Sequence, residues 1–326
     1  MILHNNSLYL VKSKTYLVFT VFFLSVLSAF RILGKDRDYK SYARFYDKIS
    51  LGDFGSRFEP GFELVSGLFK IIYGNDSFSL FLFFIAFVGL YLKFSIILDK
   101  KYYPLLILVY TFLIFPLHEM TQIRVGLAVS LMYWALNKSI TSNINLVKKL
   151  LFIIIGISFH SSVIIMAPFI LFPKLISKGN FNLRKVLIIA VPILLVSYSM
   201  NIIISFSPFV EYYLYEISLQ ETLDINPLSS RNIIFIAILI IGLFNHNKIP
   251  TRNLPWFYLS ILGIGLWYTF MWLPVFAHRF LEITIFAYLV WVPSLPKNSR
   301  LISMGLLLLL SSYFFIKLVF LDMYFV

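Results

Sequence analysis

Two aspartates lie in a short run of charged residues near the start of the chain, where Asp36 and Asp38 follow Arg31 and precede Tyr39 and Tyr42. A carboxylate beside cations stays ionised and can still accept a proton, so either aspartate could act as a general base towards a hydroxyl. The alternative is a solvated loop whose opposite charges neutralise one another at little gain in stability. The sequence leaves open which of the two aspartates matters.

Another carboxylate, Glu59, comes directly before Pro60. Proline favours an extended backbone at the residue before it, and apolar residues then recur at helical spacing from Phe62 to Ile72. This pattern predicts an interfacial helix on the outer leaflet. Glu59 would either favour the N-terminus of this helix electrostatically, or hydrogen-bond a sugar and position a base.

Arg124 follows Gln122 at the turn where one apolar run ends and the next begins. A guanidinium can hold two phosphate oxygens at once, and the start of a helix adds free amide donors and a partial positive charge. The position therefore suits a pyrophosphate. The alternative is an arginine that reaches out to the lipid headgroups.

Histidines mark two further positions. His160 lies among serines in the middle of the apolar run 149–173, and His278 precedes Arg279 at a turn rich in aromatic residues. His160 could be a base or a hydrogen-bonded packing residue, and some of the aromatic residues could stack on sugars. A zinc site formed with His118 is not expected, because no close pair of ligands occurs and nearby arginines would oppose a cation.

These residues are embedded in a very hydrophobic chain. Its 326 residues are 60% hydrophobic and only 13% charged, and the mean hydropathy is +0.85. A soluble domain has roughly a quarter of its residues charged, so the composition excludes an ordinary soluble enzyme and indicates a polytopic membrane protein. The chain has no cysteine, which excludes disulfides and thiolate catalysis.

The apolar runs predict an all-α helical bundle in a single transmembrane domain, 1–326, with about nine full spans and a re-entrant or short helical hairpin over 149–173. The first span is expected to be a retained signal anchor. The predicted spans are 15–34, 77–98, 103–117, 122–138, 186–205, 231–245, 255–274, 279–293 and 300–320.

The net charge of +13 comes from 28 Lys+Arg against 15 Asp+Glu, and the basic residues cluster in alternate loops. Positive loops stay cytoplasmic, which places the N-terminus inside and the polar segments 35–76 and 206–230 outside. This distribution holds only if 149–173 enters and leaves on the same side, with His160 at its outer tip. The positive charge is therefore a topology signal that attracts anionic headgroups, and a nucleic-acid partner is not expected.

Four short motifs together resemble the EpsG/Wzy-type polymerases of bacterial exopolysaccharide, capsule and O-antigen. In chain order they are Arg31…Asp38-Tyr39-x-x-Tyr42, Glu59-Pro60-Gly61-Phe62, Gln122-x-Arg124-x-Gly126-x-Ala128 and Ser158-Phe159-His160-x-Ser162. The resemblance covers about the first 175 residues, and the C-terminal half matches only in hydrophobicity and in the His278-Arg279 turn. Two departures are Val125, where glutamine is frequent, and Asp36 behind Gly34, which could align in place of Asp38.

The resemblance implies that the chain joins oligosaccharide repeat units, carried on undecaprenyl pyrophosphate, at the outer face of the bacterial cytoplasmic membrane. Pathway partners would be a flippase and a chain-length regulator, and neither a cofactor nor a metal is expected. The residues expected to bind pyrophosphate are Arg124, Arg279 and Arg31, and those expected to act as base or to orient hydroxyls are Asp38, Asp36, His160 and Glu59. The other residues expected to contact substrate are Gln122, Tyr39, Tyr42 and His278.

Two alternatives use the same features differently. A flippase or secondary transporter would favour matching halves and charges at mid-membrane, whereas here the halves do not match and the polar groups crowd one face. An O-antigen ligase-like glycosyltransferase would share the lipid donor and the arginines, and would differ only in its acceptor.

Overall fold

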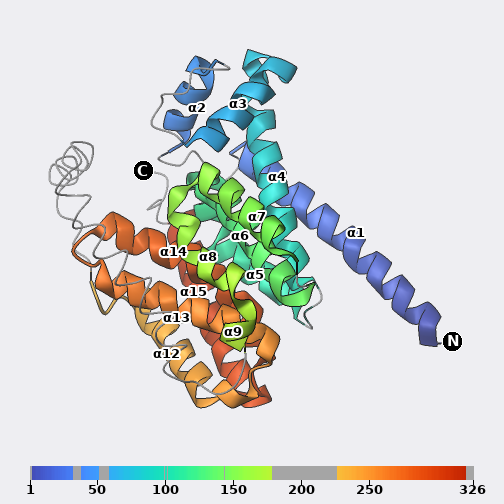
Figure 1. Ribbon diagram of the computed structural model, residues 1–326, viewed down its shortest axis with the longest axis vertical. Helices are drawn as coiled ribbons and strands as arrows, with labels where there is room; N and C mark the ends of the chain where they lie inside the picture. Colours follow the sequence, from blue (N-terminus) through green and yellow to red (C-terminus); the bar gives the residue numbers. More distant parts are fainter. Residues whose placement is uncertain are drawn as a thin grey trace. The chain divides into compact units, whose positions relative to one another are not determined.

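The computed structural model describes residues 2–31, 38–50, 59–98, 100, 102–142, 144–177 and 226–320. Within these residues the secondary structure is helical and includes no strand (Figure 1). The chain divides into two compact units, Met1–Pro173 with Leu307–Val326, and Lys174–Leu306. Asp36, the predicted span 186–205 and most of the predicted outer loop 206–230 lie outside the described residues.

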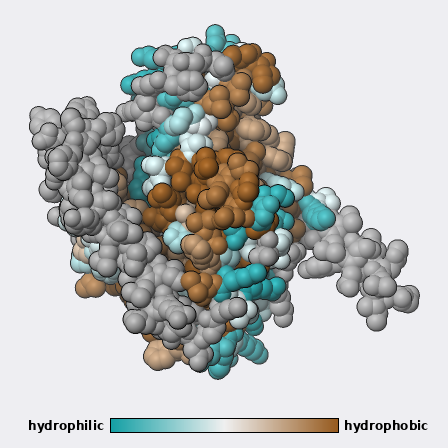
Figure 2. Space-filling view, in the orientation of Figure 1, coloured by the Kyte–Doolittle hydropathy of each residue, from teal (hydrophilic) through white to brown (hydrophobic). Residues whose placement is uncertain are grey.

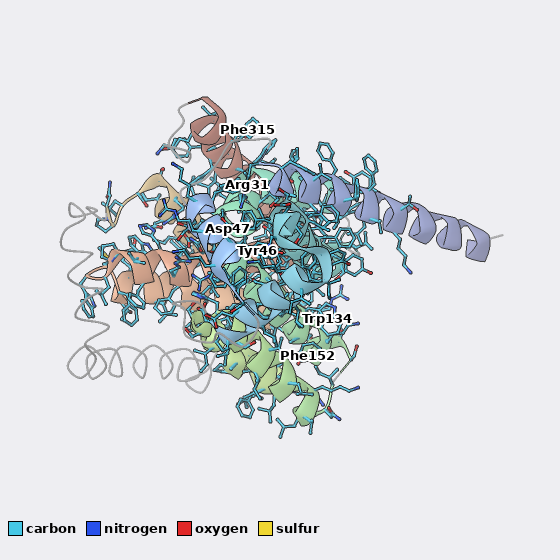
Figure 3. The ribbon with its side chains drawn as sticks, turned by 90° about the horizontal axis from the view of Figure 1, so that it is seen from above. Arg31, Tyr46, Asp47, Trp134, Phe152 and Phe315 are labelled. Atoms are coloured by element: carbon cyan, nitrogen blue, oxygen red, sulfur yellow. The ribbon has the colours of Figure 1, made fainter. Side chains whose placement is uncertain are left out.

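The first unit is built around α4, which packs against α1 and α6, while α6 packs against α7. Trp134 of α6 meets Phe152 of α7 edge to face, with ring centroids 5.0 Å apart (Figure 3). The helices of this unit are α1 (Ile2–Ala29), α2 (Tyr39–Lys48), α3 (Pro60–Tyr73), η1 (Asn75–Ser77), α4 (Phe78–Ile97), α5 (Tyr103–Leu113), the π-helical turn η2 (Pro116–Thr121), α6 (Ile123–Thr141), α7 (Leu146–Phe159), η3 (Ser161–Met166) and α8 (Ala167–Leu171).

The chain reverses its direction at His160, where α7 ends. The backbone of His160 is extended, with φ −164° and ψ 119°. Beyond it the chain runs back beside α7, as the hydrogen bond from Lys149 Nζ to the carbonyl of Leu171 at 3.2 Å shows. An uninterrupted helix would hold these two residues roughly 33 Å apart. His160 therefore lies at the tip of a hairpin formed by α7, η3 and α8.

The second unit is centred on α13 and α14, which pack along each other. Their contact is rich in aromatic residues: Phe257 meets Trp291 edge to face at 4.9 Å, and the indole of Trp291 donates to the hydroxyl of Ser260 at 3.0 Å. The helices here are α9 (Pro173–Ser177), α12 (Ser230–Phe244), η4 (His246–Lys248), η5 (Thr251–Asn253), α13 (Leu254–Thr269), α14 (Pro274–Trp291), η6 (Val292–Ser294) and the first part of α15 (Lys297–Phe320), whose last residues belong to the first unit.

Among the residues that the structure describes, three helical segments are long and apolar enough to cross a membrane, Asn75–Ile97, Pro274–Ser294 and Lys297–Lys317, and four shorter helices are also apolar. Each predicted span within the described residues overlaps a helix, and the count of about nine full spans stays a prediction. An apolar surface over α7 and the hairpin includes Leu151, Ile154 and Ile164, each more than half exposed (Figure 2). Such a surface is unfavourable in water and suits hydrocarbon, so the chain is a multi-pass membrane protein.

Candidate functional site

The first unit brings together Glu59, Arg124 and His160, three residues that are far apart in the sequence. One carboxylate oxygen of Glu59, Oε2, accepts a hydrogen bond from Nη1 of Arg124. The other, Oε1, lies 2.5 Å from Nδ1 of His160. A single carboxylate thus bridges a guanidinium and an imidazole, and we call these three residues the bridge cluster.

Glu59 occupies this position because of the residues that follow it. It precedes the first residue of α3, Pro60, and has the extended backbone that a following proline favours (φ −71°, ψ 145°). Its side chain does not cap the helix, so it is available for Arg124 and His160. A Cβ at Gly61 would lie 2.3 Å from Oγ of Ser158, which shows how closely the start of α3 meets the end of α7.

Arg124 lies in the first turn of α6, directly after η2. Gly126 allows this helix to begin where it does, because a Cβ there would stand only 2.1 Å from the carbonyl oxygen of His118. His118, Glu119 and Met120 in η2 are buried. The turn between these two apolar runs is therefore folded into the protein.

Tyr42 of α2 lies beside the bridge cluster, next to Arg124. Its ring lies 5.9 Å from the guanidinium carbon of Arg124, within range for a cation–π contact, and its hydroxyl hydrogen-bonds Arg124. Two contacts hold α2 against α3: Tyr42 packs on Phe62 at 5.8 Å, and Lys70 Nζ donates to the carbonyls of Asp47 and Ile49 at the end of α2. The predicted outer loop thus contains a packed helix pair that supports the cluster.

The bridge cluster is partly shielded from solvent, since its three side chains are 16–19% exposed. Burial raises the pKa of the Glu59 carboxyl, but the hydrogen bond from His160 and the charge of Arg124 together outweigh burial, so that the pKa lies below its ordinary value. Glu59 is therefore ionised at neutral pH. Each of the three side chains keeps some exposed surface.

This geometry fixes the role of each nitrogen of His160. An ionised carboxylate only accepts hydrogen bonds, so Nδ1 of His160 carries the proton that it shares with Glu59. In the neutral imidazole, Nε2 is then the nitrogen that can accept a proton. A histidine held in this way can take a proton from a hydroxyl, and the guanidinium beside it can stabilise developing negative charge.

Other predicted residues of the first unit lie at helix ends. Arg31 follows α1 with a positive φ of 51°, which is unusual for a residue other than glycine, and its guanidinium carbon lies 5.3 Å from the ring of Tyr39. Figure 3 labels Arg31 at the end of α1 and Tyr46 on α2.

Asp38 is the residue before α2, and its carbonyl accepts a hydrogen bond from the backbone N–H of Tyr42 at 3.0 Å. Gln122 precedes α6 and is buried.

His278 and Arg279 belong to the second unit, in the first turns of α14. His278 accepts a hydrogen bond at Nδ1 from Nη2 of Arg231, at 2.7 Å. Arg231 lies at the beginning of a predicted span and was not among the expected site residues.

A buried group in the first unit was also missed. Lys93 Nζ, fully buried in α4, donates to Oε1 of Glu119 at 2.7 Å and to the hydroxyl of Tyr110 at 3.0 Å. Tyr110 in turn donates to Oε2 of Glu119 at 2.6 Å. One signal was present in the sequence, because Lys93 is a charged residue inside the predicted span 77–98, where an ionisable group is costly and needs a partner.

No group of three His, Asp or Glu side chains is arranged to hold a metal ion within the part of the chain that the structure describes. The charged groups of the bridge cluster are instead a carboxylate between a guanidinium and an imidazole. This donor set suits an anionic substrate.

The fold and the cluster together define a multi-pass helical membrane protein with a partly shielded cluster of a carboxylate, a guanidinium and an imidazole. A comparison with family models assigns the chain to a family: the model of the EpsG family matches residues 14–325. The chain belongs to the EpsG family, the family of Wzy-type polysaccharide polymerases. No curated protein and no solved structure matches it.

Proposed function

We propose that this chain polymerises oligosaccharide repeat units, carried on undecaprenyl pyrophosphate, into a surface polysaccharide at the outer face of the bacterial cytoplasmic membrane. Membership of the EpsG family supports a glycosyltransferase-like polymerase in general. The observation that supports the specific reaction is the bridge cluster, in which Glu59 joins an arginine to an oriented histidine.

In the proposed reaction, a hydroxyl oxygen of the acceptor sugar forms a bond to the anomeric carbon of the donor. The bond from that carbon to the pyrophosphate oxygen breaks, and its electron pair leaves with the pyrophosphate. Nε2 of His160 takes the hydroxyl proton, while Glu59 stabilises the imidazolium that results. Arg124 stabilises the charge on the departing phosphate.

The other predicted residues keep supporting roles in this proposal. Asp38, or Asp36 in its place, is the second candidate for the base. Arg31 would add positive charge for the pyrophosphate, and the pyrophosphate role expected for Arg279 of the second unit stays a prediction. Pyrophosphate is already a good leaving group, so arginines can take the place of a metal ion. The N-terminus would be cytoplasmic, and the partners of the same pathway would be a flippase and a chain-length regulator.

Reconstitution tests the proposal directly. The purified chain in proteoliposomes is incubated with one repeat unit on undecaprenyl pyrophosphate, and the lipid-linked products are sized by mass spectrometry. We expect glycans of two or more units from the wild type and none from Arg124→Ala. Arg44→Ala is the matched control, because it removes an exposed arginine of α2.

Other products would contradict the polymerase. Movement of the repeat unit across the bilayer without lengthening would indicate a flippase. Transfer to a supplied lipid A core, with no lengthening on undecaprenyl pyrophosphate, would indicate a ligase.

A further inference from the structure

The second unit has a polar cluster of its own, at the end where α12 begins, α13 ends and α14 begins. Arg231 in the first turn of α12 donates to His278 of α14 at 2.7 Å. Tyr268, near the end of α13, donates to the carbonyl of Pro227 before α12 at 3.0 Å. These contacts hold three helix ends of the second unit together.

Trp267 adds a hydrogen-bond donor to this cluster. Its ring lies edge to face with that of His278, at 6.4 Å between centroids. The side chain is 1% exposed, and its Nε1 has no hydrogen-bonding partner among the described residues. A buried donor without a partner is costly, and proteins retain few of them, so this one suggests an incoming acceptor.

Asn232 adds both a donor and an acceptor. It is fully buried in the first turn of α12, and neither Nδ2 nor Oδ1 has a partner in the described part of the chain. Phe235, one turn further along, stacks on Tyr288 of α14 at 4.6 Å. Residues three apart share a helix face, so Asn232 also faces α14, the helix that carries His278.

Exposed aromatic rings surround the same helix ends. Trp272, in the turn between α13 and α14, is 53% exposed and lies over Phe270, and Tyr268 is 36% exposed. Aromatic faces next to a few fixed polar groups give a surface that binds an amphipathic ligand in one orientation. A sugar ring is such a ligand, because its C–H face packs on aromatic rings while its hydroxyls both donate and accept hydrogen bonds.

We propose that this end of the second unit is a saccharide-binding site, formed by Arg231, His278, Trp267, Asn232 and Trp272. The half-buried Arg231–His278 pair, the indole N–H of Trp267 and the side-chain amide of Asn232 belong to the same helix ends, and in this proposal they bind the hydroxyls of a sugar. The identity of the glycan rests on the proposed polymerase function, in which this site would bind a sugar of the lipid-linked glycan.

Binding can be measured without polymerisation. The full-length chain in lipid nanodiscs is titrated calorimetrically with lipid-free oligosaccharides of one to three repeat units, released from the surface polysaccharide of the cells that encode it. We expect the wild type to bind and Arg231→Ala to bind at least about tenfold more weakly, as the loss of a hydrogen bond from a charged group predicts. Arg252→Ala is the matched control, because it removes an exposed arginine at the opposite end of α13 and should bind like the wild type.

Trp267→Phe separates binding from folding. It keeps an aromatic ring but removes the unpartnered N–H, so its thermal midpoint should equal or exceed that of the wild type while its affinity falls several-fold. Absence of binding by the wild type, or wild-type affinity in both Arg231→Ala and Trp267→Phe, would overturn the site.

The two proposals fail in different ways. If the wild type binds the oligosaccharide through Arg231 but does not lengthen lipid-linked glycans, the saccharide site stands and the polymerase proposal fails. If the wild type lengthens glycans and the Arg231→Ala and Trp267→Phe variants bind like it, the polymerase stands and the saccharide site fails.

Discussion

Lys93 and Glu119 form a buried ion pair between α4 and η2, with 2.7 Å between Nζ and Oε1. Tyr110 closes the group by donating to the other carboxylate oxygen, and Ser28 of α1 donates to the backbone carbonyl of Glu119. Glu119 is thus held by α1, α4 and α5, five residues before Arg124. The pair therefore fixes the turn from which α6 presents Arg124 to the bridge cluster.

Removing one member of this ion pair should destabilise the protein more than replacing both members with apolar residues. Lys93→Met leaves the carboxylate of Glu119 buried without its cation, which typically costs about 3–5 kcal/mol. The double variant Lys93→Met/Glu119→Met removes both charges and should recover most of the loss, because apolar residues of similar volume often replace buried pairs without cost. Unfolding of the purified variants in detergent measures both, and a double variant no more stable than Lys93→Met would contradict this account.

Gly126 should tolerate no side chain. Gly126→Ala places a Cβ 2.1 Å from the His118 carbonyl oxygen, so α6 must shift away from η2 and take Arg124 with it. We expect a loss of stability of about 1–3 kcal/mol from overpacking, together with a loss of glycan elongation. Gly305→Ala in α15 is the control, since nothing lies within 4 Å of its Cβ, and it should be neutral or slightly stabilising. Equal effects of the two substitutions in unfolding and elongation assays would refute the prediction.

The bridge cluster should survive mild acid. The pKa of Glu59 lies below its ordinary value of 4.5 in the folded chain, so ionised Glu59 stabilises the fold above that value, and this contribution is lost as the pH falls through the lower, folded-state pKa. The stability difference between the wild type and Glu59→Gln should therefore persist at pH 5 and decline only below about pH 4. Thermal midpoints recorded across this range test it, and a difference that is already lost at pH 5 would show that the pKa is not lowered.

The helices of this protein could be predicted from its sequence because each long apolar run needs a helix to satisfy its backbone in a membrane. The break at His160 was also predictable, since the lysines at both ends of 149–173 belong on the same side. The association of Glu59 with Arg124 could not be predicted from the sequence. The two are 65 residues apart, and Glu59 is 101 residues from His160, so only the packing of α3, α6 and α7 brings them together.

Lys93 and Arg231 are charged residues that a topology assigned from the basic residues of loops does not take into account. Both lie within predicted spans and so carry no weight in a topology assigned from loops. Of their partners, Glu119 and His278, only His278 was an expected site residue, and the pairs that they form are contacts between helices. An ionisable residue in an apolar run is therefore better treated as half of a pair whose other member must be sought elsewhere.

Elongation should not depend on a metal ion. Arg124 lies where phosphate charge would develop, and a guanidinium does not require a cation to bind phosphate oxygens. Elongation by chelator-treated protein should therefore equal that of untreated protein in the same reconstituted assay. Activity that disappears with chelator and returns on addition of magnesium would refute this prediction.

Glu59 and His160 should behave as one catalytic unit. His160→Ala removes the proposed base and should lower turnover by roughly 10²–10⁴-fold, while Glu59→Gln, which keeps the size of the side chain but weakens its hold on the imidazole, should lower it less. Because Glu59 is proposed to act through His160, the double variant should be no slower than His160→Ala alone. Single-turnover elongation rates of the wild type, the two single variants and the double variant give the coupling between Glu59 and His160. Thermal midpoints identify any variant that is unfolded. Strictly additive effects would mean that Glu59 serves Arg124 and the substrate independently of His160.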